Sequence, residues 1–158
     1  MARKNKGFTL LELIIAITVI SVGMLGIFGM IANSMQASQD SKTRLVAAYL
    51  AQEGIELVRN SRDSNWNQGN EWTHGWPNCS SGCRTSYDNP TIRTYTPVLD
   101  GSNISVNTDG FYGESGTATQ FQRTIYIAGS GDYQEVRSVV SWPGDNQVQV
   151  IKRLYNWR

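Results

Sequence analysis

An apolar run near the N-terminus constrains this chain more than any other feature. From Phe8 to Ala32 the sequence reads FTLLELIIAITVISVGMLGIFGMIA, and Glu12 is its only ionisable side chain. As a helix these 25 residues would extend about 37 Å, at about 1.5 Å per residue, whereas a bilayer hydrocarbon core is about 30 Å thick. The run can therefore cross a lipid bilayer. It is also longer than the apolar core of a cleaved secretory signal, which has about 7 to 15 residues.

The charges around this run predict its orientation. Arg3, Lys4 and Lys6 precede it with no acidic residue among them. The positive-inside rule therefore keeps residues 1–7 in the cytoplasm and exports the C-terminal part of the chain. Over all 158 residues the formal charge is only +1, which gives no reason to expect a nucleic-acid partner.

Glu12 is a second unusual feature, because its surroundings are apolar. A carboxylate inside a bilayer costs several kcal/mol unless it is protonated, paired or close to the interface, so such an acid is a functional-site hypothesis by default. The alternative is that Glu12 lies near enough to the cytoplasmic face to be hydrated, with no partner.

The sequence Gly7-Phe8-Thr9-Leu10-Leu11-Glu12, with its basic leader and the apolar run behind it, resembles the class III signal of type IV pilins and pseudopilins. The resemblance implies that a prepilin peptidase cuts between Gly7 and Phe8 and N-methylates Phe8. It also implies that Glu12 is required for filament assembly, where it pairs with the terminal amine of a neighbouring subunit. A methylated amine still protonates near neutral pH, so cleavage creates the cation that the carboxylate needs.

The resemblance implies a structural function. The chain is expected to be a precursor that is cleaved, methylated and assembled as a minor component of a type IV pilus or a related secretion or DNA-uptake pseudopilus. The segment AAYLAQEGIELVRNSRD, residues 47–63, is similar to minor pilins and minor pseudopilins. The implied partners are other pilin subunits and the assembly machinery of the prokaryotic inner membrane. The protein would first span that membrane once and then move to a pilus or pseudopilus at the cell surface.

Residues 33–63 continue the helical pattern with mixed composition. Val46, Leu50 and Leu57 lie on one side of this helix, beside a row of small residues. The sequence thus predicts one long helix with a transmembrane half, 8–32, and an amphipathic half, 33–63, that ends near residues 62–65. On the second half, Glu53 and Glu56 are predicted to be solvated rather than a catalytic pair.

The exported domain is predicted to comprise residues 64–158. Residues 64–90 are rich in Asn, Gly, Ser and Trp and have no periodicity, so they predict a long surface loop. Cys79 and Cys83 lie within this segment, and in an exported protein they suggest a local disulfide. A metal site with His74 is disfavoured, since the spacing matches no known pattern. The three tryptophans of the segment either pack the domain or form a platform for binding a surface or sugar: Trp66, Trp72 and Trp76.

The C-terminal part, 91–158, alternates between apolar and polar residues. Segments around residues 121–127, 136–142 and 148–154 read as strands, and GSGD and WPGDN read as the turns between them. TIRTYTPVL, residues 91–99, is a possible fourth strand. The expected fold is α+β and pilin-like, with the long helix packed on an antiparallel sheet of three to four strands.

Enzymatic activity is not expected. The sequence has one histidine and contains no nucleophile elbow, no phosphate-binding glycine loop and no zinc-binding helix. No cofactor is expected either. Two other functions compete with the structural subunit: an adhesin-like tip subunit that binds through the Trp-rich loop, and a simple bitopic membrane anchor.

Overall fold

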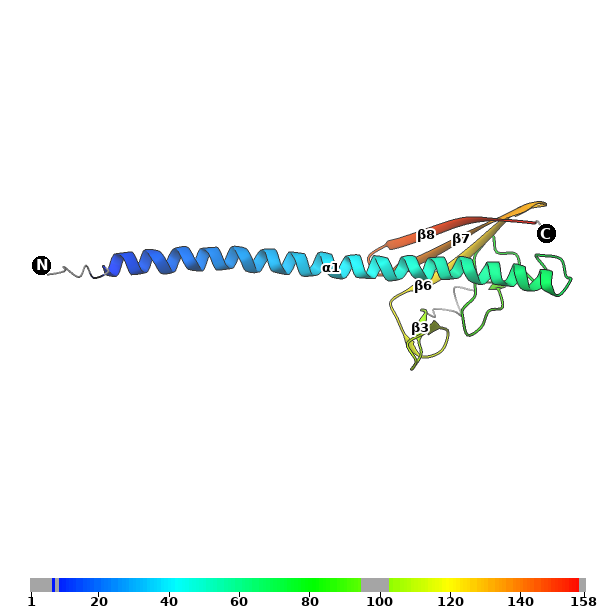
Figure 1. The fold of residues 1–158 in the computed structure, drawn as a ribbon, viewed down its shortest axis with the longest axis horizontal. Helices are drawn as coiled ribbons and strands as arrows, with labels where there is room; N and C mark the ends of the chain where they lie inside the picture. Colours follow the sequence, from blue (N-terminus) through cyan, green and yellow to red (C-terminus); the bar gives the residue numbers. More distant parts are fainter. Residues whose placement is uncertain (1–6, 8, 95–102, 157–158) are drawn as a thin grey trace, which may run out of the picture. The chain divides into compact units, whose positions relative to one another are not determined.

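The computed structural model describes residue 7, residues 9–94 and residues 103–156. Helix α1 spans Leu10–Asn67 without interruption, which confirms the prediction of one long helix (Figure 1). The chain forms two compact units, residues 1–42 and residues 43–158, and α1 contributes to both. The described strands are β1 Cys83–Arg84, β2 Arg93–Thr94, β3 Ser105–Val106, β4 Tyr112–Gly113, β5 Thr117–Ala118, β6 Gln122–Ser130, β7 Tyr133–Trp142 and β8 Asn146–Tyr155.

The C-terminal end of α1 is closed by a Schellman motif. The N–H of Asn70 donates to the carbonyl of Asn65 at 2.9 Å, and the N–H of Gly69 donates to that of Trp66 at 3.0 Å. Gly69 has φ of +75°, the left-handed conformation that this motif needs and that glycine adopts without strain. The helix therefore ends two residues beyond the predicted range of 62–65, because its stop signal is the glycine.

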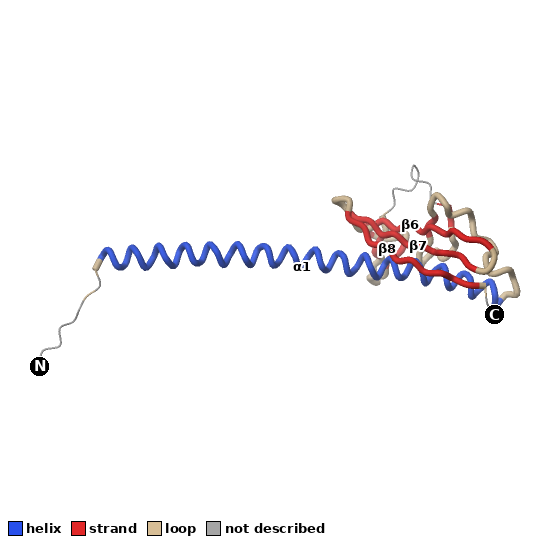
Figure 2. Tube along the Cα trace, turned by 90° about the horizontal axis from the view of Figure 1, so that it is seen from above, coloured by secondary structure: helices blue, strands red, loops and turns tan. Residues whose placement is uncertain are grey.

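The second unit contains the predicted antiparallel sheet. Its strand order is β2-β1-β6-β7-β8, and the long strands β6, β7 and β8 are joined by two tight hairpins (Figures 1 and 2). Ser130 pairs with Tyr133 across the first turn, and Trp142 pairs with Asn146 across the second. Alternation fixes which face is buried: Ile125, Val136 and Val140 point into the core and their strand neighbours point outward.

The short strands differ from the sequence-based expectation. The predicted fourth strand begins as β2, which pairs with β1 rather than with a long strand, and residues 95–99 of that prediction lie outside the described residues. A second small sheet has the order β4-β3-β5. Each of these strands has only two residues, so alternation has no length over which to show itself.

Buried residues of α1 between 47 and 62 pack on the sheet, whereas residues 33–42 of the predicted amphipathic half, 33–63, are exposed. Ala47, Leu50 and Ala51 form one buried cluster with Phe121 and Val140. A second cluster contains nine buried residues from the helix, the following segment and the sheet: Ile55, Val58, Trp72, Cys79, Cys83, Ile92, Ile125, Val136 and Leu154.

Residues 64–90 are less of a surface loop than expected. Trp72 is only 4% exposed, Trp66 and Trp76 pack against the same cluster, and β1 belongs to the main sheet. Apolar residues from this segment supply core material, because they are buried in one cluster with residues of α1 and of the main sheet. The tryptophans therefore serve as packing residues, the first of the two interpretations offered by the sequence.

Candidate processing and assembly site

The N-terminal end of α1 is built around Thr9. Thr9 is the N-cap residue, and its Oγ1 accepts a hydrogen bond of 3.3 Å from the backbone N–H of Glu12. The carbonyl of Thr9 also accepts the first helical hydrogen bond, from the N–H of Leu13 at 3.2 Å. The pattern Thr-x-x-Glu is that of a capping box, so the sequence that resembles a processing signal also specifies where the helix begins.

Glu12 thus lies in the first turn of α1, at the third helical position. Its side chain is exposed, and no cation of the described residues lies within ion-pair distance of it. The amide dipoles at a helix N-terminus favour a carboxylate at this position. Gly7 precedes the cap by two residues, whereas Phe8 lies outside the described residues.

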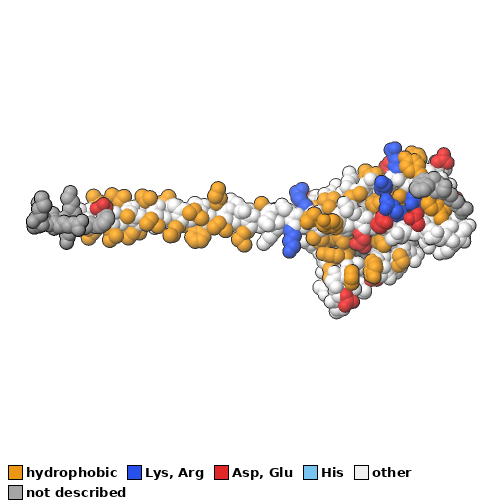
Figure 3. All heavy atoms as spheres, in the orientation of Figure 1, with side chains coloured by type: hydrophobic (Ala, Val, Ile, Leu, Met, Phe, Trp, Pro, Cys, Tyr) orange, Lys and Arg blue, Asp and Glu red, His pale blue; other side chains and the backbone are white. Residues whose placement is uncertain are grey.

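Every residue of α1 from 10 to 42 is exposed, up to the end of the first unit. Large apolar side chains cover this stretch, and Figure 3 shows them along it. Added Cβ atoms at Gly23, Gly26 and Gly29 would meet nothing within 4 Å. By length and composition the helix is able to cross a membrane. An apolar surface of this extent needs lipid or other helices around it.

Between residues 10 and 32, the side chains other than Glu12 that carry polar groups are two hydroxyls, and both are satisfied within the helix. The hydroxyl of Thr18 donates to the carbonyl of Ile15 at 2.8 Å, and that of Ser21 donates to the carbonyl of Ile17 at 2.7 Å. Such internal bonds remove the cost of placing a hydroxyl in hydrocarbon. Glu12 is the exception among them, since its carboxylate has no such intrahelical partner in the described part of the chain.

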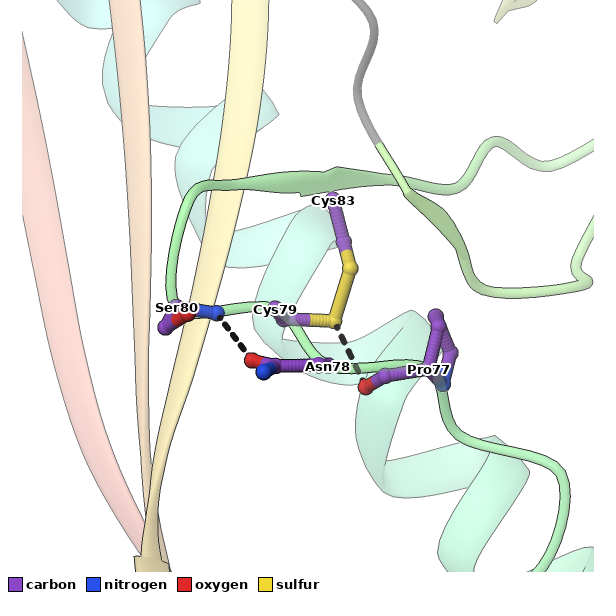
Figure 4. The surroundings of a disulfide bond; sticks show 5 residues. All are labelled: Pro77, Asn78, Cys79, Ser80 and Cys83. Atoms are coloured by element: carbon purple, nitrogen blue, oxygen red, sulfur yellow. Dashed lines mark hydrogen bonds between the residues drawn. A yellow bond between two sulfur atoms is a disulfide. The ribbon is translucent and has the colours of Figure 1, made fainter.

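Cys79 and Cys83 are joined by a disulfide in the structure (Figure 4). Both residues are buried, and Cys83 pairs with Ile125 of β6, so the bridge fastens the segment after α1 to the main sheet. Both sulfurs are used in this bond, and neither is a thiolate for a metal. His74 is exposed, and its backbone carbonyl accepts a hydrogen bond from Asn65.

Arg123 connects the helix and the sheet from inside the domain. Its guanidinium donates to the carbonyl of Leu50 at 2.9 Å and to that of Thr85 at 2.8 Å, and it lies 3.4 Å from the Oε2 of Glu53. Burial lowers the pKa of Arg123, and the carboxylate of Glu53 acts in the opposite direction. The prediction that Glu53 is solvated is therefore wrong, whereas Glu56 is exposed and pairs with Arg59 at 2.7 Å.

Asp88 joins its loop to the small sheet. Its carboxylate accepts hydrogen bonds from the N–H of Glu114 at 3.0 Å and of Ser115 at 3.2 Å, and from the hydroxyl of Ser115. Desolvation, the largest single contribution, raises the pKa of Asp88, but the hydrogen bonds together outweigh it and lower the pKa to about 2. Gly113 permits this approach, because a Cβ there would lie 2.8 Å from the carboxylate.

Sequence reasoning missed the roles of Arg123 and Asp88. The signal for Arg123 was present: it lies between Phe121 and Ile125 on the apolar face of a strand, where a charged side chain must have a buried partner. The partners of Asp88 are backbone amides 26 and 27 residues further along the chain, and no spacing rule indicates them.

The geometry defines a class of protein: one N-terminal apolar helix with an acid in its first turn, continued into a small α+β domain. Residues 2–28 match the prokaryotic N-terminal methylation motif, which is the class III signal of type IV pilins and pseudopilins. Comparisons with curated proteins and with solved structures gave no match. The protein is therefore prepilin-like, and the motif implies processing by a prepilin peptidase and assembly with pilins.

This motif also determines the broad location and the kind of function. Its helix crosses the membrane, and proteins that carry it are typically found in the inner membrane and then in a pilus. They are structural proteins and not enzymes.

Proposed function

We propose that the mature protein begins at N-methylated Phe8 and is a minor subunit of a type IV pilus or a related pseudopilus. The single observation that carries this proposal is the position of Glu12. It lies in the first turn of α1, at the start of an apolar stretch that is exposed from residue 10 to residue 42, with no cation near it among the described residues. A carboxylate in such a helix needs a partner, and the amine created by cleavage at Gly7 is suitable.

The location of the cut fits the start of the helix. Thr9 is the cap, so cleavage before Phe8 would leave one residue ahead of the cap and would not remove any residue of α1. The leader carries three of the 14 basic side chains, and its loss would change the formal charge from +1 to −2. The hydrated charges that hold the helix at the inner leaflet would be gone, which favours movement of the helix into a filament.

The amine of the same chain is four residues before Glu12 in the sequence, and the amine of another copy is the alternative partner. In a staggered array of helices, each carboxylate meets the amine of its neighbour and the pair is shielded from water. Glu12 then selects the register between subunits. A simple membrane anchor has no need of this acid.

The assignment as a minor subunit rests on the segment 47–63 and on the disulfide. The bridge joins two cysteines with a sequence separation of 4 in the segment that follows α1, and the sequence has no cysteine after Cys83 with which to enclose a C-terminal loop. This departs from the arrangement of common major pilins.

Mass spectrometry of the protein purified from its native cell tests the proposal. We expect the mature chain to start at Phe8 and to carry one additional methyl group on its N-terminus. A Gly7→Leu variant should retain residues 1–7 and stay in the membrane fraction, whereas Gly23→Ala serves as a control within the same helix and should be processed normally. An intact leader on the native protein would refute the proposal and leave the membrane anchor.

A further inference from the structure

A polar hollow lies where the β7–β8 turn meets the start of β6. Its volume is about 630 Å³, within the range of small-molecule sites. Five of the described lining residues have carboxamide side chains: Asn103, Gln120, Gln122, Asn146 and Gln147. The first precedes β3, the next two lie just before and in β6, and the last two lie in β8.

The charges around the hollow narrow the ligand class. Among the described residues that line it, Asp145 is the one ionisable residue, and none is a lysine or an arginine. A phosphate, carboxylate or sulfate group would meet no cationic side chain among the described lining residues, so an anionic ligand is disfavoured. A carboxamide both donates and accepts hydrogen bonds, and so does each hydroxyl of a sugar.

One of the described residues that line the hollow is aromatic. Trp142 lines the hollow and is half-buried, and its ring stands edge-to-face against Phe121 with 6.3 Å between the ring centroids. Phe121 is buried in the core and fixes the indole. The indole packs on the core face of the sheet, whereas Gln122, Ser141 and Gln147 lie on the opposite face, so the hydrogen-bonding side chains and not the aromatic ring determine the ligand class.

Several of the amides are held in place before any ligand arrives. The Nε2 of Gln122 donates to the Oδ1 of Asn103 at 2.9 Å, which leaves the Oε1 of Gln122 and the Nδ2 of Asn103 for a ligand. The Nδ2 of Asn146 donates to the carbonyls of Pro143 and Gly144, which leaves its Oδ1 as an acceptor. Such preorganisation reduces the cost of ordering side chains on binding.

The remaining two amides are available to a ligand. Gln120 and Gln147 are exposed, and neither side chain has a hydrogen-bond partner within the described residues. By contrast, the carboxylate of Asp88, outside the hollow, already accepts hydrogen bonds from Glu114 and Ser115. The hollow therefore offers donors and acceptors that the fold does not use.

From this chemistry we infer that the hollow is a binding site for a neutral saccharide. The binding function is located here and not in the Trp-rich segment, where Trp72 is buried. It is independent of the proposed role as a filament subunit, because a monomeric, unprocessed chain would have the same site. For one sugar ring in an open site, we expect a Kd on the order of 1 mM.

Saturation-transfer NMR on the full chain tests this inference. The chain is kept in a polyoxyethylene detergent, because a sugar-headed detergent would compete, and glucose, galactose, mannose and N-acetylglucosamine are the probes. The double variant Gln120→Ala, Gln147→Ala should weaken binding about 10-fold, since each lost hydrogen bond accounts for about 2- to 10-fold. The matched control is Gln52→Ala, Gln149→Ala, which removes two exposed glutamines outside the hollow and should bind as the parent does.

Two results would overturn the inference. One is the absence of saturation transfer to all four sugars at concentrations roughly tenfold above the expected Kd. The other is binding that the Gln120→Ala, Gln147→Ala variant retains in full. A deoxy analogue of whichever sugar binds gives an independent check, because a site built around hydroxyl groups should bind the analogue more weakly.

Discussion

Replacement of Arg123 by methionine should destabilise the exported domain strongly. The change removes hydrogen bonds to the carbonyls of Leu50 and Thr85 and leaves the carboxylate of Glu53 without its partner. Breaking a buried ion pair costs about 3 to 5 kcal/mol. The side chain of Glu53 is 32% exposed and can regain some water, so we expect a loss of about 3 kcal/mol, a large share of a typical stability of about 5 to 15 kcal/mol.

Urea unfolding followed by tryptophan fluorescence measures this loss. All five tryptophans follow residue 65, so the signal reports on the exported domain even when the apolar helix is held in a micelle. Arg153→Met is the matched control: it removes an arginine that pairs with Glu135 at 3.2 Å on the surface, and such exposed pairs contribute little. Equal midpoints for the Arg123→Met and Arg153→Met variants would refute the role given to Arg123.

Three further predictions use the same assay. The pKa of Asp88 in the folded protein is about 2, below its ordinary 3.8, so its contribution to the free energy of unfolding is present above pH 3.8 and is lost as the pH falls toward 2. Asp88→Asn should remove that part of the pH dependence of stability. An unchanged pH profile in this variant would contradict the role of Asp88. Gly54→Ala should destabilise the domain by about 1 to 2 kcal/mol, although alanine has a better helix propensity than glycine. The new Cβ would lie 2.5 Å from the Oγ of Ser138 and 2.9 Å from the Cδ of Arg123. A more stable variant would show that the helix can shift to make room. Cys79→Ser with Cys83→Ser should cost about 2 kcal/mol, as should a reducing agent on the parent chain, and no loss in either would show that the short loop is fixed by packing alone.

The long helix and the three long strands were predictable because each has a period that repeats many times. The apolar run, the stripe through Leu50 and the alternation around Ile125 report local burial, and local burial decides those elements. The two-residue strands were not predictable, since they exist only through their partners. The helix ends at Asn67, and its stop signal is Gly69. A search for apolar periodicity does not use that glycine.

The functional residues also fall into two groups, those that sequence reasoning can place and those that it cannot. Gly7, Thr9 and Glu12 are adjacent in sequence, so their arrangement follows from the helix that Thr9 caps. The pair of Glu53 and Arg123 joins positions 70 residues apart, and amphipathic spacing alone placed Glu53 in solvent. The hollow near Trp142 likewise gathers amides from three separate segments, none of which forms a motif.

In the proposed function, the charge of Glu12, and not its position at the helix start, drives assembly. The cap bond to Thr9 comes from the backbone N–H of residue 12, so Glu12→Gln removes the charge and leaves the start of α1 intact. Thr9→Val does the reverse, because it removes the Oγ1 that accepts the N–H of Glu12 and keeps the carboxylate.

The deciding measurement is the share of mature chain that each variant places in sheared filaments, relative to the membrane fraction of the same cells. We expect Glu12→Gln to be processed at Gly7 but to remain in the membrane, and Thr9→Val to enter filaments. Filament entry by Glu12→Gln at the level of the parent would contradict the account.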